Sequence, residues 1–191
     1  MLVRSRSAHR SFALAAPLLL FGPLGCSSDE QANVVLDAVV EVADTTFRAI
    51  DEDETWLAPG AEAGFDISGT ITNEIGGSLT AGGWRTTTQN DDGGGIHLSF
   101  GERVVVELSQ WEAAGTLLSG RMSVTRHSLD YGPSGGNIED ASRTTRYQAQ
   151  LSAEGNAEGS FTVDVHAFAS GAVLWTCGVV NETEVEFGPC F

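Results

Sequence analysis

The sequence predicts an all-β domain, either an antiparallel β-sandwich or a partly closed up-and-down β-barrel, preceded by one N-terminal amphipathic helix. Three observations support this fold class. From Gly64 onward apolar and polar residues alternate with a period of two, which is typical of half-buried strands. Glycine-containing turns separate these alternating runs, and no helical pattern lies between them. Antiparallel neighbours follow, because parallel strands need long crossover connections.

The first 25 residues have the pattern of a secretory signal peptide. Arg4, Arg6 and Arg10 form a basic segment, and residues 12–21 (FALAAPLLLF) form an apolar segment of the length found in such leaders. This segment is too short to cross a bilayer, which requires about 20 apolar residues. We therefore expect residues 1–25 to be a removable leader, residues 26–60 to be a tether, helix and linker, and residues 61–191 to be the β domain.

The end of the leader, Pro23-Leu24-Gly25-Cys26, resembles the lipobox of bacterial lipoprotein precursors. Gly25 and Cys26 match the family pattern, whereas Pro23 stands where leucine is usual. The resemblance implies cleavage before Cys26, acylation of Cys26, and a lipid anchor in the cell envelope, in the outer membrane rather than the inner membrane. The alternative is an ordinary secretory leader that leaves Cys26 as a thiol.

Charge narrows the classes of partner. All 10 basic residues are arginines, and three of them lie in the leader, so the mature chain carries 7 arginines against 26 acidic residues, a net charge of 7 − 26 = −19. A chain of this charge repels nucleic acids and anionic lipid headgroups. We therefore expect no nucleic-acid partner, contact with a membrane only through the N-terminal lipid, and a protein or glycan of the envelope as partner.

The stretch after Cys26 predicts the helix. Leu36, Val40, Ala43, Phe47 and Ile50 recur at helical spacing and mark one apolar side. Many β-branched residues in this stretch favour a strand instead. The periodicity extends over a long window and outweighs them, so we expect a helix that ends near residue 50.

Alternating runs predict eight or nine strands in the rest of the chain. Residue pairs that contain glycine supply the backbone conformations of tight turns, and one such turn is predicted at Gly101-Glu102. The apolar positions of these runs are Phe65, Ile67 and Ile71; Ile96, Leu98 and Phe100; Val104, Val106 and Leu108; Leu118, Met122 and Val124; Tyr147, Ala149 and Leu151; Phe161, Val163 and Val165; Val173, Trp175, Cys177 and Val179; and Val185 and Phe187.

The cysteines predict one disulfide bond. If Cys26 carries lipid, Cys177 and Cys190 remain as an even pair, which is expected in an oxidising compartment. A bond between them would fix the C-terminus to the sheet. A redox or metal-binding thiol pair is the alternative, but the sequence has no CxxC spacing.

Three histidines are the candidates for a metal site. His97, His127 and His166 occupy polar positions of their predicted strands, and on neighbouring strands they could bind a metal such as zinc. No closely spaced ligand pair accompanies them, so they fit surface residues better. We expect no cofactor.

Trp84 and Trp111 are the ligand-binding candidates. Trp84 is out of step with the apolar positions before it, and Trp111 lies at the end of a predicted strand, so both are candidates for exposure, whereas Trp175 is expected in the core. Exposed aromatic rings can stack on sugars or anchor a protein interface. The alternative for Trp84 is a shift at Gly82-Gly83 that returns its ring to the core.

A serine within Gly132-Pro133-Ser134-Gly135-Gly136 matches the letters of the GxSxG hydrolase motif. That motif requires a buried strand before the serine and a helix after it, and the sequence predicts neither. The sequence thus favours a lipid-anchored, extracytoplasmic β domain with a non-catalytic binding or structural role. The alternatives are binding of carbohydrate or a small hydrophobic ligand through exposed tryptophans, and a hydrolase that uses acidic residues or Ser134.

Overall fold

The computed structural model describes residues 28–60, 64–91, 96–132, 140–170 and 173–187. One helix, α1 (Ser28–Glu52), is followed by a short 3-10 turn, η1 (Glu54–Trp56), and then by strands alone. The strands are β1 (Leu57–Pro59), β2 (Gly64–Thr72), β3 (Ser78–Asp91), β4 (Ile96–Ala113), β5 (Thr116–Gly132), β6 (Asp140–Gly155), β7 (Gly159–Ser170), β8 (Val173–Val180) and β9 (Thr183–Phe187).

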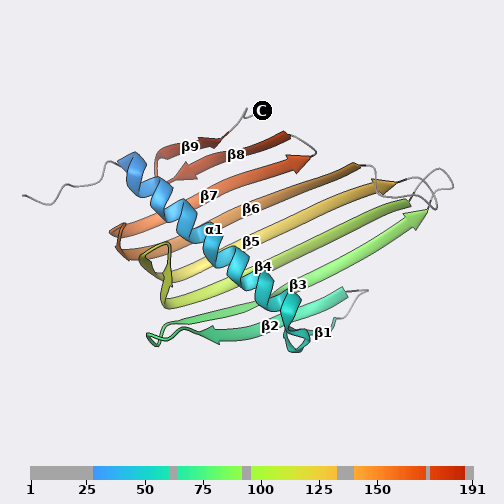
Figure 1. Cartoon of the computed structure of the whole chain (residues 1–191), viewed down its shortest axis with the longest axis horizontal. Coiled ribbons are helices and arrows are strands. Elements are labelled where there is room, and N and C mark those ends of the chain that lie inside the picture. The colour runs from blue at the N-terminus through green and yellow to red at the C-terminus, as the bar shows by residue number, and fades with distance from the viewer. Residues whose placement is uncertain (1–27, 61–63, 92–95, 133–139, 171–172, 188–191) are drawn as a thin grey trace, which may run out of the picture.

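The described strands form one open antiparallel sheet in which each strand pairs with its neighbour in sequence, in the order β1 to β9. Helix α1 crosses one face of this sheet diagonally, from β9 towards β2 (Figure 1). The predicted all-β class with a preceding helix is confirmed. The strand order is the up-and-down one, and a helix, not a second sheet, covers the face.

Helix α1 begins at Ser28, and the acidic Asp29 and Glu30 in its first turn interact favourably with the helix dipole. Its buried side is centred on Val35, Val39 and Val42, so the packed stripe is rotated by about one residue from the predicted one. Leu36 and Val40, which the sequence predicts on the apolar side, are half-buried. The helix ends at Glu52, two residues after the expected end.

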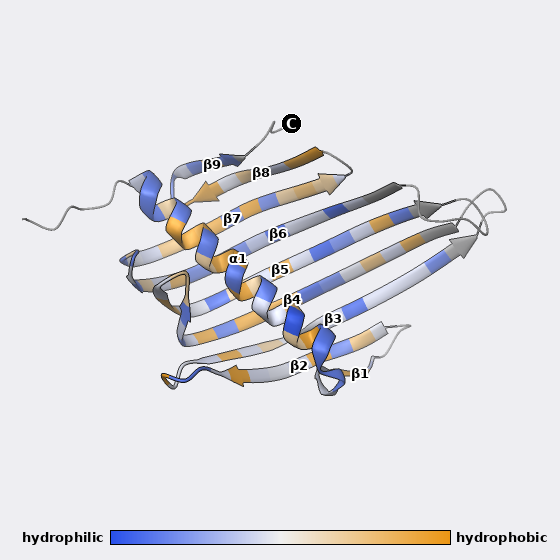
Figure 2. Ribbon diagram, viewed as in Figure 1, coloured by the Kyte–Doolittle hydropathy of each residue, from blue (hydrophilic) through white to orange (hydrophobic). Residues whose placement is uncertain are grey.

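The helix and the sheet share one hydrophobic core. Apolar and polar residues alternate along α1 and along the strands, as expected of elements with one buried and one exposed side (Figure 2). Val39 and Val42 of α1 pack in one cluster with buried residues of the central strands, among them Val106, Leu118 and Met122. The face of the sheet that α1 packs on is called the covered face below, and the opposite one the open face.

The strand boundaries differ from the prediction at two places. Strand β3 is not among the predicted runs, because its 14 residues include long polar stretches with few apolar positions. The predicted turn at Gly101-Glu102 lies inside the continuous strand β4, where Gly101 pairs with His127 and Glu102 with Arg126. A glycine beside a charged residue resembles a turn in sequence, and here both residues are part of a ladder.

Candidate functional site

The open face is polar along β2 and β3. Its positions on β2 and β3 alternate with buried residues such as Ile67, Leu79 and Ala81 of the covered face. Thr70 Oγ1 and Thr80 Oγ1 lie 3.1 Å apart across the two strands. An antiparallel sheet with one packed and one solvated face has this composition. The hydroxyl side chains of this part of the open face are Ser68, Thr70, Thr72, Ser78, Thr80, Thr86 and Thr88.

Trp84 is a large aromatic side chain on the open face and is 43% exposed. The register of β3 with β4 runs without a shift from Ser78 to Asp91, so Gly82-Gly83 does not return the ring to the core. A side chain at Gly101 would place its Cβ 3.5 Å from Trp84 Cζ3. The indole therefore lies beside the bare backbone of Gly101 and presents its other side to solvent.

A hollow of about 400 Å³ opens next to Trp84. Phe65, Asp66, Arg85 and Thr86 line it together with Trp84. Asp66 and Thr86 share the open face with Trp84, whereas Phe65 and Arg85 have the parity of buried Ile67 and point to the covered face, so on the open face the hollow presents one aromatic ring, a carboxylate and a hydroxyl group. A flat apolar ring beside polar groups can hold a ligand that has an apolar face and hydroxyl groups at its edge.

Trp111 is buried, with 8% of its surface exposed, which corrects its place among the candidates for exposure. A β-bulge explains the difference. The register of β4 with β5 shifts between Leu108 and Trp111, and Gln110 adopts a positive φ of 50°. The extra residue reverses the alternation, so Leu108 and Trp111 both point to the covered face. Nothing in the spacing of the sequence marks this bulge.

Trp175 lies on the open face, although the sequence predicts it in the core. Its ring stacks on Phe168 with centroids 5.6 Å apart, and its strand neighbour Val173 is 48% exposed. Gly178, not Trp175, lies opposite the buried Val165, so the covered face of β8 carries the even-numbered positions. The apolar alternation of β8 predicts the wrong side because this strand has apolar residues on both sides.

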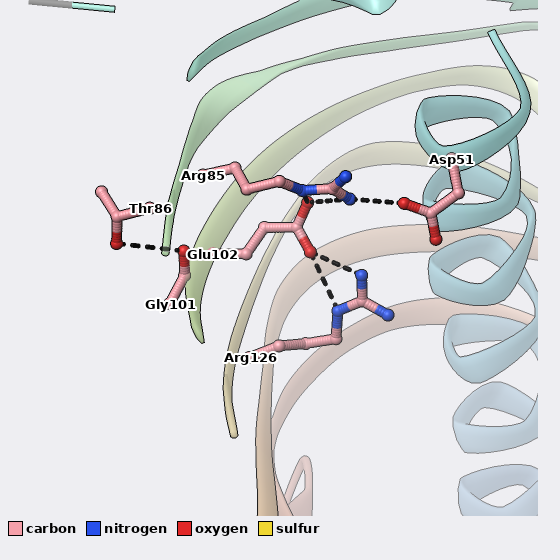
Figure 3. Close-up of polar contacts among 6 residues, drawn as sticks. All are labelled: Asp51, Arg85, Thr86, Gly101, Glu102 and Arg126. Atoms are coloured by element: carbon pink, nitrogen blue, oxygen red, sulfur yellow. Dashed lines mark hydrogen bonds and ion pairs between the residues drawn. The ribbon is translucent and has the colours of Figure 1, made fainter. Parts of the chain in front are cut away.

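A buried ion-pair cluster fixes the C-terminal end of α1 to the sheet (Figure 3). Glu102 is fully buried and lies between two arginines. Arg85 Nη2 lies 2.8 Å from Glu102 Oε1, and Arg126 Nη2 lies 2.5 Å from Glu102 Oε2. Arg85 Nη2 also donates a hydrogen bond to Asp51 Oδ1 of α1 at 2.6 Å. We call Asp51, Arg85, Glu102 and Arg126 the polar cluster.

The polar cluster also has aromatic partners. The guanidinium carbon of Arg126 lies 3.2 Å from the ring centroid of Phe47 on α1, in a cation–π contact. Burial lowers the pKa of Arg85, but the hydrogen bonds and charges of Asp51 and Glu102 outweigh it, so the pKa lies above its usual value. Sequence reasoning missed this cluster. The one feature of the sequence that indicates it is Glu102, an acidic residue at a position where the alternation of Phe100 and Val104 predicts an apolar one.

Tyr147 makes the stability of the fold depend on pH in the alkaline range. Burial, and secondarily the negative charge of Asp44, raise its pKa above the ordinary 10.0. A folded-state pKa above the unfolded one favours the native state at low pH, and this contribution is lost as the pH rises through the folded pKa. The chain has no lysine and only 2 tyrosines, so few other groups titrate in this range.

We therefore expect the native protein to lose stability as the pH rises above about 10, and Tyr147→Phe to remove part of this loss. Urea unfolding of both proteins from pH 8 to pH 11.5 measures the difference. Equal slopes of stability against pH for the two proteins would show that Tyr147 ionises as freely in the folded state as in the unfolded one.

The structure does not bring the candidate histidines together. His127 on β5 and His166 on β7 lie on the open face with β6 between them, and the side chain of His97 lies outside the described part of the chain. Ser99 Oγ and His127 Nε2 lie 3.3 Å apart, and His166 lies near Asp164. Within the ranges that the structure describes, no group of three or more His, Cys, Asp or Glu residues is placed to hold a metal ion.

Several predicted features lie outside the described residues. These are the leader, Cys26, the GxSxG segment with Ser134, and Cys190. Cys177 lies on β8, and its pairing with Cys190 stays a prediction. No helix in the described ranges has both the length and the apolar character needed to cross a membrane.

Comparisons with known protein families, characterised proteins and solved structures find no match to this chain. The open face offers an exposed indole beside a polar hollow, and the covered face holds the polar cluster at the end of α1.

Proposed function

We propose that this chain is a lipid-anchored, extracytoplasmic β domain with a non-catalytic binding role in the cell envelope, and that it binds carbohydrate through the open face at Trp84. The observation that carries the proposal is the indole of Trp84, which lies beside the bare backbone of Gly101 and borders a hollow of about 400 Å³. A sugar ring has a flat apolar side that can stack on an exposed indole, as other flat ligands do.

The groups around Trp84 suit the hydroxyls of a sugar. Asp66 and Arg103 are its cross-strand partners on β2 and β4, and Thr86 is the next residue of β3 on the same face. A carboxylate accepts hydrogen bonds, a guanidinium group donates them, and a hydroxyl does both. This set is held on the rigid strands of one sheet, which favours binding without reorganisation.

The anchor part of the proposal rests on the lipobox-like residues and on the start of α1. Cys26 and Ser28 are two residues apart, so at most about 7 Å of chain joins a lipid on Cys26 to the helix. This spacer would hold the domain close to the bilayer, in the outer membrane by family analogy. Mass spectrometry of the mature protein should find an acylated Cys26 at the N-terminus, and an unmodified Cys26 would contradict the anchor.

The carbohydrate proposal is tested by titrating the protein with soluble oligosaccharides, such as chitotetraose and maltotetraose, and following intrinsic tryptophan fluorescence. We expect Trp84→Ala to weaken binding by about tenfold or more, as the loss of a central aromatic anchor does. Trp175→Ala is the matched control, because it removes an open-face indole on a distant strand, and it should leave binding unchanged.

Two results would contradict the carbohydrate proposal. Binding that survives in Trp84→Ala but is lost in Trp175→Ala would place the site at the other aromatic pair. The absence of binding by the unmodified protein to any oligosaccharide tested would refute carbohydrate as the ligand class.

A further inference from the structure

A second hollow, of about 240 Å³, lies next to Arg126, whose guanidinium group contacts Phe47 of α1 on the covered face. Residues of β4, β5 and β6 line it, namely Phe100, Arg126, His127, Ser128, Arg143, Thr144 and Thr145, of which His127 and Thr144 have the parity of the open face. Phe100, Ser128 and Arg143 form one cross-strand row, and Arg126 and Thr145 belong to the next row. The five side chains therefore come from three adjacent strands and point to the same side of the sheet.

The charges at this hollow are positive in a strongly acidic chain. Two arginines and no carboxylate line it. Arg126 uses Nε and Nη2 to bind Glu102, but its side chain is 30% exposed, and its third nitrogen contacts none of the residues drawn in Figure 3. Arg143 is exposed and has no ion-pair partner within the described ranges. Both guanidinium groups are placed to meet an anion.

The other lining side chains on the covered face are apolar or neutral. The ring of Phe100 is half-buried, and the guanidinium carbon of Arg85 lies 5.4 Å from its centroid. Ser128 and Thr145 add hydroxyl groups. Pockets for drug-sized ligands are roughly 300–1,000 Å³, so this smaller hollow suits a ligand of about ten non-hydrogen atoms or fewer.

Asp130 limits the charge that the hollow can accept. It lies on the same face of β5, two residues beyond Ser128, and its Oδ1 is buried without a hydrogen-bond partner. Asp51 and Glu102 already pair with Arg85 and Arg126, and the α1 carboxylates Asp44 and Glu52 line a neighbouring hollow that Arg126 also borders, so the positive charge left for a ligand is small. A singly charged anion is therefore favoured over a phosphate dianion.

We infer that this hollow binds a small organic monocarboxylate with a flat or branched apolar body. The guanidinium of Arg143 would hold the carboxylate through two parallel hydrogen bonds, Arg126 would add a second positive charge, and Phe100 would pack on the apolar body. This site lies on the opposite face from Trp84 and does not depend on the carbohydrate proposal.

The test uses benzoate as the probe, with the mature chain followed by amide chemical shifts in two-dimensional NMR. We expect saturable shifts at the amides of Ser128, Thr144 and Thr145, and affinity about tenfold weaker in Arg143→Gln. Arg121→Gln, which removes an exposed arginine that pairs with Glu107, should leave the affinity unchanged. Asp130→Asn should tighten binding, because it removes the opposing charge.

The other outcomes would overturn the inference. Equal shifts with the neutral analogue benzamide would mean that the hollow is only apolar. Tighter binding of inorganic phosphate than of benzoate would contradict an organic monocarboxylate. Unchanged benzoate affinity in both Arg143→Gln and Asp130→Asn, or no saturable shifts at all, would refute the site.

Discussion

Substitution of Glu102 by alanine is expected to lower the free energy of unfolding by about 3–5 kcal/mol. Glu102 is fully buried, and each of its carboxylate oxygens accepts a hydrogen bond from a different arginine, Arg85 or Arg126. Its removal leaves Arg126 without its carboxylate and leaves Arg85 with only Asp51. Unpaired charges in a partly buried site carry a large desolvation cost. Chemical denaturation at neutral pH measures the change.

Glu107 provides the matched control for this prediction. It lies on the same strand and pairs with Arg121, but both side chains are more than half exposed. We expect Glu107→Ala to cost less than about 1 kcal/mol, since exposed ion pairs contribute little. Similar costs for the two substitutions would show that the polar cluster is not buried in solution as the structure places it.

The second large effect is expected for Phe47→Ala, which should cost about 3–5 kcal/mol. Phe47 is 4% exposed on the packed side of α1, and Arg126 lies against its ring. The substitution opens a cavity between the helix and the sheet and also removes the cation–π contact. The loss of stability is measured by thermal and urea unfolding, followed by circular dichroism.

Two variants separate the causes of that loss. Phe47→Leu keeps an apolar side chain but removes the ring, so its cost should be intermediate. Phe65→Ala removes an equally large but 47% exposed ring and should cost less than about 1 kcal/mol. If Phe65→Ala were as costly as Phe47→Ala, the packing of α1 on the sheet would not be the source of the effect.

Much of the fold follows from hydrophobic patterning. The period of two in runs such as Val104, Val106 and Leu108 identifies strands whose positions are buried as expected. The helix is likewise visible from the spacing of Phe47 and Ile50, both buried. Patterning fails where a residue departs from its usual environment, as at Glu102, whose burial depends on two arginines from other strands.

The candidate sites are less predictable, because they depend on whether the alternation of side chains between the two faces of the sheet continues or is broken over a few residues. Trp84 follows two glycines, and its exposure depends on β3 continuing through them without a bulge. Trp111 is buried only because a bulge occurs at residues 109 and 110. The positive φ of Gln110, which accompanies that bulge, has no signature in a single sequence.

The central claim is that α1 covers one face of a single sheet and leaves the face with Trp84 open to solvent. Hydroxyl-radical footprinting with peptide mass spectrometry tests it directly, because it measures the oxidation rate of each tryptophan in the folded protein. From exposed fractions of 43% and 8%, Trp84 should be oxidised about five times faster than Trp111. Equal rates, or faster oxidation of Trp111, would contradict the assignment of the two faces and the binding site built on it.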